Sequence, residues 1–90
     1  MKTMGLHEKR EKIILDKTNW PVPGIYKHYK GGEYDLVGVA KYSETLEDVV
    51  IYRARYDDKI LWARPLKMFL DKVLVEGKLV PRFSLIKEVK

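Results

Sequence analysis

The feature that most constrains the fold is a series of short β-type segments, bounded by turns, that fills the chain from Gly24 onward. Residues 25–30 and 33–42 are rich in aromatic and β-branched side chains. Gly31-Gly32 between them suits a two-residue hairpin loop with positive φ at both positions. Counting outward from that loop pairs His28 with Asp35 and residue 26 with residue 37. The first two strands are therefore expected to form a hairpin in this register.

The rest of the chain continues in the same way. Residues 49–56 and 60–64 are typical of strands, and residues 74–87 read as a closing hairpin around Glu76-Gly77. Pro65 suits the first position of a short helix, where its missing N–H costs nothing. About five short strands and one small helix predict a mainly β fold, a small SH3-like barrel. A split αβ sandwich with a longer final helix is the alternative.

The first 22 residues differ in character from the rest. Residues 6–17 are charge-dense, and their few apolar side chains fall on one helical face, which indicates a short, weakly amphipathic helix. Pro21 and Pro23 then end any helix, because a proline biases the preceding residue towards extended backbone. We therefore expect residues 1–22 to be an N-terminal extension, fastened by Trp20 and Val22, and residues 23–90 to be a single small β-barrel domain.

The composition excludes several kinds of site. There is no cysteine, which rules out disulfides and thiolate zinc sites and favours a reducing cytoplasm. No apolar run approaches the roughly 20 residues that span a bilayer, so no membrane role is expected. The 18 basic and 13 acidic side chains leave a net charge of +5, which permits a nucleic-acid partner without requiring one. No motif for a metal or a cofactor is present, so neither is expected.

Five different short motifs lie between Gly24 and Phe83. In chain order they are GIYKHYKGGEY (24–34), YSET (42–45), YRARY (52–56), LWARPL (61–66) and VPRF (80–83). Together they resemble a family of small, mostly bacterial proteins known as domain of unknown function 1653. That family has no established activity, substrate or catalytic residues. The resemblance therefore implies the kind of domain and leaves its chemistry open.

Side chains alternate between the two faces of a strand, and this divides the strand residues into two sets. The nearly uncharged inner set is expected to form the core: Ile25, Tyr29, Tyr34, Leu36, Gly38, Ala40, Tyr52, Ala54 and Tyr56. The outer set is Tyr26, His28, Asp35, Val37, Val39, Lys41, Ile51, Arg53 and Arg55. Rings that stack and arginines that pair with phosphate or carboxylate suit a contact surface. An ordinary half-solvated sheet, with arginine stems covering apolar neighbours, is the other interpretation.

Five side chains bear on chemistry or on helix docking. His28 opposite Asp35 could act as an acid–base pair, but no nucleophile or substrate-polarising group accompanies it, so no catalytic residue is predicted. Arg64 and Arg82 each lie beside a proline and match the family motifs, which suits either an anion site or a structural ion pair. Trp62 is expected to dock the helix or join the core.

These observations favour a non-catalytic recognition module that binds nucleic acid or an acidic protein segment. The expected binding residues are Tyr26, His28, Arg53 and Arg55, with Arg64 and Arg82 as further candidates. If nucleic acid is the partner, replacing Arg53 and Arg55 should weaken binding and leave the fold intact. The alternative is a protein that binds or acts on an anionic small molecule such as a nucleotide, through His28 and Arg64. An accessory domain that works beside another protein is a third interpretation.

Overall fold

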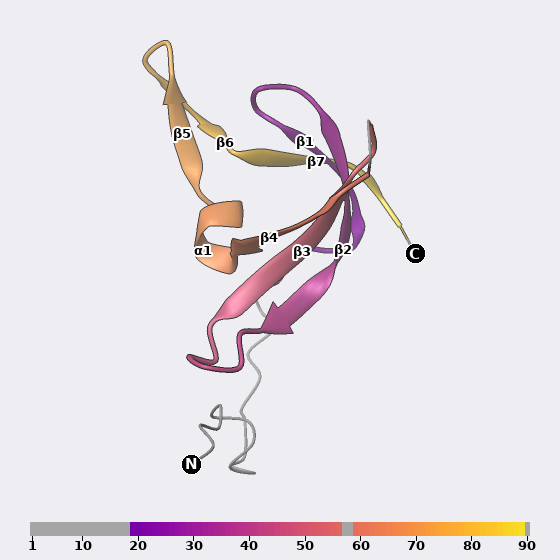
Figure 1. Cartoon of the computed structure of the whole chain (residues 1–90). Coiled ribbons are helices and arrows are strands. Elements are labelled where there is room, and N and C mark those ends of the chain that lie inside the picture. Colours follow the sequence, from indigo (N-terminus) through magenta and orange to yellow (C-terminus); the bar gives the residue numbers. More distant parts are fainter. Residues whose placement is uncertain (1–18, 57–58, 90) are drawn as a thin grey trace, which may run out of the picture.

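The computed structural model describes residues 19–56 and 59–89. Strands dominate that part of the chain and are joined by one short helix, which confirms the mainly β class (Figure 1). The strands are β1 (Gly24–His28), β2 (Glu33–Lys41), β3 (Asp48–Ala54), β4 (Leu61–Pro65), β5 (Lys72–Val75), β6 (Lys78–Pro81) and β7 (Phe83–Glu88), and helix α1 spans Leu66–Phe69.

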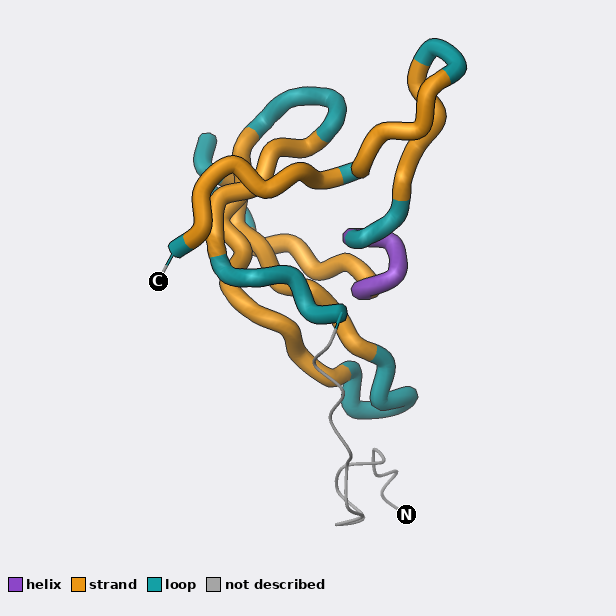
Figure 2. The backbone as a smooth tube through the Cα atoms, turned by 180° about the vertical axis from the view of Figure 1, so that it is seen from behind, coloured by secondary structure: helices purple, strands orange, loops and turns teal. Residues whose placement is uncertain are grey.

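Five strands form one antiparallel sheet in the order β4-β3-β2-β1-β7, and β5 pairs with β6 in a separate hairpin. The large sheet is twisted and curved, and α1 lies on its concave side (Figures 1 and 2). Strands β4 and β7 are its two edges, and the ladders of the described residues do not join them. The five-stranded barrel expected from the sequence thus takes the form of a curved sheet that stays open between these two edges.

The loop between β1 and β2 is longer than the sequence predicts. Ile25 pairs with Asp35, whereas the two-residue loop would pair it with a residue three positions further along. Gly31 and Gly32 do have positive φ, 101° and 82°, as expected. They belong, however, to a connection that spans residues 29–32, because β1 ends at residue 28 and β2 begins at residue 33. The prediction of a two-residue loop, and the register that followed from it, are wrong.

The three-residue shift reverses the face of β1 that points inward. Side chains alternate along a strand, so an odd shift exchanges its two faces. Tyr26, predicted on the outer face, is buried in the core, and its hydroxyl donates to the carbonyl oxygen of Val22 at 2.6 Å. His28 lies on the same inner face, paired with Phe83 of β7, so its expected position opposite Asp35 is wrong as well.

A β-bulge exchanges the two faces within β2. The ladder with β3 shifts by one residue between Leu36 and Gly38, which leaves Val37 as the extra residue. Beyond the bulge, Val39 packs against the core and Ala40 is exposed, the reverse of the prediction. A glycine inside a strand is a known sign of a bulge, so Gly38 was the available signal.

Aromatic rings fill the core where α1 meets the sheet. Phe69 of α1 stacks on Phe83 of β7, with centroids 4.3 Å and planes 10° apart. Tyr52 of β3 meets both rings, at 5.3 Å from Phe83 and 5.7 Å from Phe69. Leu36 and Ala54 are also buried, so these two and Tyr52 confirm that part of the predicted core. Each aromatic pair adds about 0.5–1.5 kcal/mol beyond the area that it buries.

The β5–β6 hairpin extends away from the large sheet (Figure 1). Glu76 and Gly77 at its tip both have positive φ, 48° and 79°, which confirms the predicted turn and matches a type I′ geometry. Leu74 and Leu79 face each other across the hairpin and are largely exposed. Pro81 ends β6 at the break before β7, where its missing N–H removes no ladder bond from the large sheet.

The residues just before β1 are tied to the sheet. Trp20 Nε1 donates to Asp48 Oδ2 at 3.4 Å, and the Val89 N–H donates to the Pro23 carbonyl oxygen at 3.0 Å. With the Tyr26 bond to Val22, these contacts hold residues 20–23 against the sheet, in agreement with the roles expected for Trp20 and Val22. The helix predicted over residues 6–17 lies outside the described residues.

Gly24 allows β1 and β7 to approach each other closely. A Cβ at this position would collide with the Lys87 carbonyl oxygen and lie 2.9 Å from Leu85 Cδ1. We expect Gly24→Ala to lower the free energy of unfolding by about 1–3 kcal/mol, the usual cost of overpacking a close contact. Urea denaturation followed by circular dichroism measures this loss.

Gly38→Ala is the matched control for this substitution. A Cβ at position 38 meets nothing within 4 Å, so the variant should keep its stability or gain slightly from the stiffer unfolded chain. Equal losses in the two variants would contradict the proposed closeness of β1 and β7.

Candidate functional site

The outer face of the sheet keeps two of the predicted binding residues. Arg53 and Arg55 are both exposed there. Arg55 Nη1 lies 2.7 Å from Asp35 Oδ1, and its Nε lies 4.0 Å from Glu33 Oε1. Arg53 Nη1 donates to the Lys59 carbonyl oxygen at 3.3 Å. Arg55 is therefore already paired with carboxylates, and this face is less basic than the sequence alone indicates.

The two aromatic residues predicted to complete this face lie on the other side of the sheet. Tyr26 is a core residue, and burial, followed by the charge of Glu88, raises the pKa of its phenol. It has no surface for a partner to contact. His28 is half-buried on the inner face, edge-on to Phe83 at 5.0 Å between ring centroids. The basic-aromatic face expected from the sequence is thus divided between two surfaces.

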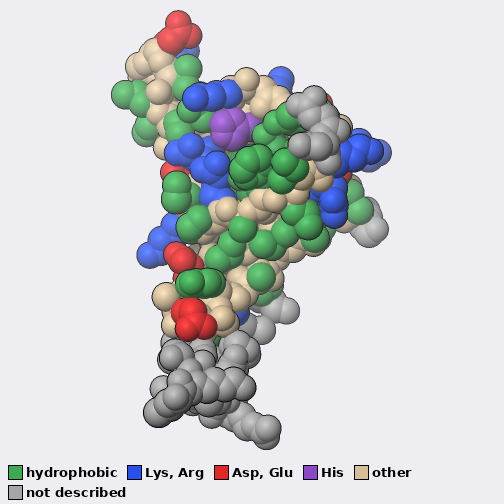
Figure 3. All heavy atoms as spheres, in the orientation of Figure 1, with side chains coloured by type: hydrophobic (Ala, Val, Ile, Leu, Met, Phe, Trp, Pro, Cys, Tyr) green, Lys and Arg blue, Asp and Glu red, His purple; other side chains and the backbone are tan. Residues whose placement is uncertain are grey.

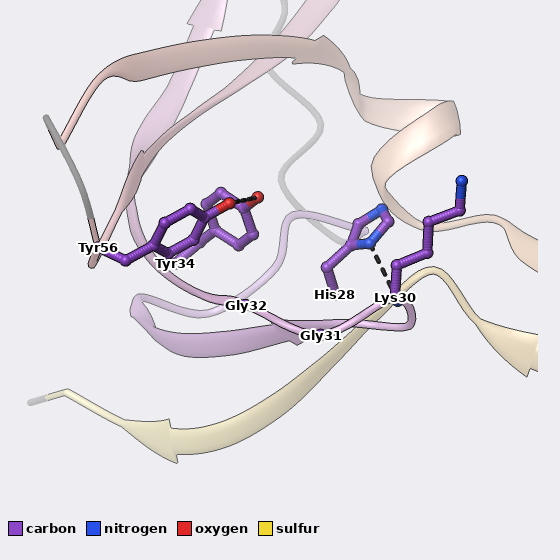
Figure 4. Close-up of a pocket in the computed structure, with 6 residues that line it drawn as sticks. All are labelled: His28, Lys30, Gly31, Gly32, Tyr34 and Tyr56. Atoms are coloured by element: carbon purple, nitrogen blue, oxygen red, sulfur yellow. Dashed lines mark hydrogen bonds between the residues drawn. The ribbon is translucent and has the colours of Figure 1, made fainter.

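His28 belongs instead to a concave site on the inner side of the sheet. One pocket of about 220 Å³, which we call the aromatic pocket, is lined by His28, Tyr34, Tyr52, Trp62, Arg64 and Phe83. A second of about 480 Å³, the turn pocket, is lined by His28, Lys30, Gly31, Gly32, Tyr34 and Tyr56 (Figure 4). Both pockets are lined by His28 and Tyr34, so they adjoin at these two side chains, and we call the two together the hollow. In Figure 3 the histidine lies between basic and hydrophobic side chains.

The sheet register brings the lining residues together. Trp62 and Arg64 are two residues apart on β4, so both side chains lie on one face. Trp62 pairs with Tyr52 on β3, and His28 pairs with Phe83 across β1 and β7. The aromatic pocket therefore spans the opening between the two edges of the sheet, and four of its lining residues come from two strand pairs, β3–β4 and β1–β7.

The two arginines beside prolines differ in their partners. Arg82 donates from Nε and Nη2 to the two oxygens of Asp71, at 2.6 Å and 3.2 Å, and this bidentate pair lowers the pKa of Asp71. Arg64 donates from Nε to the Tyr52 hydroxyl at 3.1 Å, and its Cζ lies 5.8 Å from the Phe83 centroid. No described carboxylate forms an ion pair with Arg64. Arg82 therefore has a structural partner, whereas Arg64 presents an unpaired charge to the pocket.

His28 is held as a neutral hydrogen-bond donor. The main-chain N–H of Lys30 donates to its Nδ1 at 3.2 Å, so the proton of the neutral ring resides on Nε2 (Figure 4). Burial, and then the positive charges of Arg64, Arg82 and Lys30, lower the pKa of His28 below its ordinary 6.5. Near neutral pH the ring offers the pocket an N–H group.

Tyr34 and Tyr56 form a hydroxyl pair at the other side of the turn pocket, with their oxygens 2.6 Å apart (Figure 4). Burial, followed by this hydrogen bond, raises the pKa of Tyr34 to about 12. Tyr34 therefore stays an uncharged phenol at physiological pH. It adds a ring and hydroxyl groups to the site without adding negative charge.

Sequence reasoning selected His28 and Arg64 for the site but assigned other lining residues to different roles. Trp62, expected to dock the helix or join the core, is 50% exposed. Tyr52, expected in the core, is buried there and also lines the pocket, whereas Tyr34, also expected in the core, is only half-buried. The spacing of Trp62 and Arg64 was the available signal, because residues two apart on a strand share a face.

Other pockets lie on the described residues, among them one on the outer face lined by Asp35, Arg53, Arg55 and Lys59, where acidic and basic groups meet. A pocket of about 250 Å³ between α1 and the start of β3 is lined by Glu47, Asp48, Leu66 and Lys67, without an aromatic ring. Within residues 19–56 and 59–89, no group of three or more His, Asp or Glu side chains could hold a metal ion. None of the helices in this same part of the chain has the length and apolarity needed to cross a membrane.

The fold and site define a small, mainly β domain with a concave, basic-aromatic hollow on the inner side of its sheet. The chain belongs to the family described as protein of unknown function (DUF1653), whose model matches residues 24–85. A crystal structure of a DUF1653 protein from Bordetella bronchiseptica is similar, with a TM-score of 0.70 and 33% sequence identity over 79% of this chain and 94% of that chain. No curated protein matches the sequence.

The low pKa of His28 makes folding stability depend on pH. The unfolded chain binds this proton more readily than the folded one, so unfolding is favoured as the pH falls below about 6.5. We expect the free energy of unfolding to decrease over this range in the native protein. His28→Gln should lose most of that dependence, because its amide oxygen can accept the same Lys30 N–H and cannot be protonated. Guanidinium titrations at pH about 5 and about 7.5 measure the difference. An identical pH dependence in both proteins would show that His28 is not its source.

Proposed function

We propose that this domain is a non-catalytic recognition module that binds single-stranded nucleic acid in the hollow formed by the aromatic and turn pockets. One observation carries the proposal: exposed rings and an unpaired guanidinium line the same concave surface. Proteins that bind single strands without duplex contacts combine stacking rings with cations that follow the phosphates.

Stacking is supported by the exposure of the rings. Trp62 is half exposed at the rim of the aromatic pocket, and Tyr56 is 43% exposed at the turn pocket. Both are therefore accessible to an incoming base, unlike the buried Phe83 and Tyr52 beneath them. Stacking one base on such a ring contributes about 1–3 kcal/mol.

The charges on this side of the molecule support an anionic ligand. Arg64 and Lys30 form no ion pair with a described carboxylate, and neither pocket has an acidic lining residue. Asp71, whose carboxylate also feels the charge of Arg64, is engaged by Arg82 in a bidentate pair. The hollow thus combines rings with uncompensated positive charge.

The protonation and hydrogen bonding of His28 favour binding without catalysis. Its Nδ1 accepts a main-chain hydrogen bond, and its low pKa makes the ring a donor of a hydrogen bond instead of a strong base. A cytoplasmic location forms part of this proposal, because single-stranded RNA is available there and the chain has no cysteine.

An anionic small molecule such as a free nucleotide is the second candidate. It is favoured by the pocket of about 220 Å³ that contains both His28 and Arg64, since a bounded cavity suits a small ligand. Competition separates the two candidates. A mononucleotide that displaces a bound oligonucleotide at equal concentration would support the small ligand, and a far weaker competitor would support the strand.

Titration of a fluorescently labelled single-stranded RNA with the protein at several salt concentrations tests the proposal. We expect the binding constant to fall with salt, with a logarithmic slope of about −0.7 for each phosphate contacted. Arg64→Gln should reduce that slope by about one contact, and Trp62→Val should weaken binding by about 1–3 kcal/mol. Circular dichroism confirms that each variant is folded.

Arg53→Gln is the matched control, because it removes one arginine charge from the neighbouring strand on the opposite face. It should leave the affinity nearly unchanged. An equal loss in Arg53→Gln and Arg64→Gln would return the binding site to the outer face, and absence of binding at low salt would overturn the nucleic-acid proposal. An acidic peptide that binds in place of RNA would identify a protein partner.

A further inference from the structure

The hydrogen-bonding groups of the aromatic pocket are donors. Arg64 uses Nε on the Tyr52 hydroxyl, while its two terminal nitrogens bond to no described residue. Tyr52 accepts that bond, so its own O–H proton remains for another acceptor. His28 adds its Nε2–H, because Nδ1 accepts from the chain. A ligand group that satisfies these three side chains must be rich in acceptor oxygens.

The floor of the aromatic pocket is closed. Phe83 and Tyr52 line it and are 7% and 4% exposed, so they form a buried base beneath the exposed Trp62. A ligand group that enters this pocket therefore rests on a buried aromatic base. The larger turn pocket adjoins through His28 and Tyr34 and leads outward past Lys30 and the glycines.

A terminal phosphate and an internal phosphate differ in the number of acceptor oxygens that they offer to the donors of the pocket. A terminal phosphomonoester presents three acceptor oxygens and about −1.5 to −2 charge near neutral pH, whereas an internal phosphodiester presents two free oxygens and a single charge. Three donor side chains around one pocket match the first group better than the second. The guanidinium group of an arginine can also donate two hydrogen bonds to the oxygens of one phosphate.

We propose that the aromatic pocket binds the terminal phosphate of a single strand, with the adjoining nucleotide stacked on Trp62 and the next phosphate near Lys30 in the turn pocket. This inference rests on the proposed function, because it specifies which part of the nucleic acid enters the site. It assigns Arg64, Tyr52 and His28 to the phosphate and leaves Arg82 with Asp71.

The test compares single-stranded RNA oligonucleotides of one sequence that carry a 5′-phosphate, a 3′-phosphate or hydroxyls at both ends. An unphosphorylated oligonucleotide one residue longer controls for the added charge. We expect one of the phosphorylated forms to bind at least about tenfold tighter than both unphosphorylated ones, a difference of about 1.4 kcal/mol. This preference should largely disappear in Arg64→Gln and persist in Arg53→Gln.

The pKa of His28 gives a second, independent measurement of binding at this site. Binding of the phosphorylated strand should raise the pKa of His28, because a nearby anion favours the protonated ring. A pH titration of the His28 ring signals by NMR, assigned with His28→Gln, measures this shift with and without the strand. The unphosphorylated strand should shift it less.

The outcomes separate this inference from the function on which it rests. Equal binding of all four oligonucleotides would overturn end recognition and leave strand binding intact. Binding of none of them would remove both. A phosphate preference that survives unchanged in a folded Arg64→Gln variant would place the terminal phosphate elsewhere and overturn the assignment to this pocket.

Discussion

The ring of Phe83 is the contact on which the rest of the structure depends. It stacks on Phe69 of the helix, meets Tyr52 of the sheet, and lies beneath both His28 and the Arg64 guanidinium. The same side chain is therefore a central core residue and the floor of the aromatic pocket. Stability and ligand recognition are coupled in this protein, because any change that loosens the core at this point also reshapes the pocket.

Much of the fold could be predicted from local signals. The mainly β class, the short helix after Pro65 and the Glu76-Gly77 turn follow from residue types whose backbone preferences act over one or two positions. The register of β1 could not be predicted in this way. Two glycines specify positive φ, but they do not specify how many neighbours join the loop, and an error of an odd number of residues inverts a whole strand.

The candidate site, like the fold, could be predicted only in part. His28 and Arg64 were selected from the sequence because imidazole and guanidinium groups carry recognisable chemistry. The small-molecule alternative already placed these two together, but the rings that surround them were not predictable, since these depend on the register of β1 and on which residues border each arginine. Arg64 and Arg82 both lie next to prolines, yet among the described residues Arg82 forms an ion pair with Asp71, eleven residues away in sequence, and Arg64 forms none. Proximity in the folded chain decides between a structural ion pair and a free cation.

The two faces of the sheet differ in whether their positive charges are paired with acids. Arg55 on the outer face lies beside Asp35 and Glu33, so that surface is locally balanced and its salt bridge, exposed to water, contributes little to stability. On the inner face, Arg64 and Lys30 line the hollow and form no ion pair with a described carboxylate. The hollow therefore carries two uncompensated positive charges without any basic cluster in the sequence.

The hydrogen bond from the Lys30 main chain to His28 links backbone shape to proton position. The loop over residues 29–32 turns through two residues with positive φ, and this path delivers an N–H to one nitrogen of the ring. The location of the imidazole proton is thus set by the course of the loop. A substitution at Gly31 or Gly32 that re-routed the backbone would remove the contact that holds the proton on Nε2, leaving either ring nitrogen free to carry it. The hydrogen-bonding character of the aromatic pocket would then change without a change in any side chain that lines it.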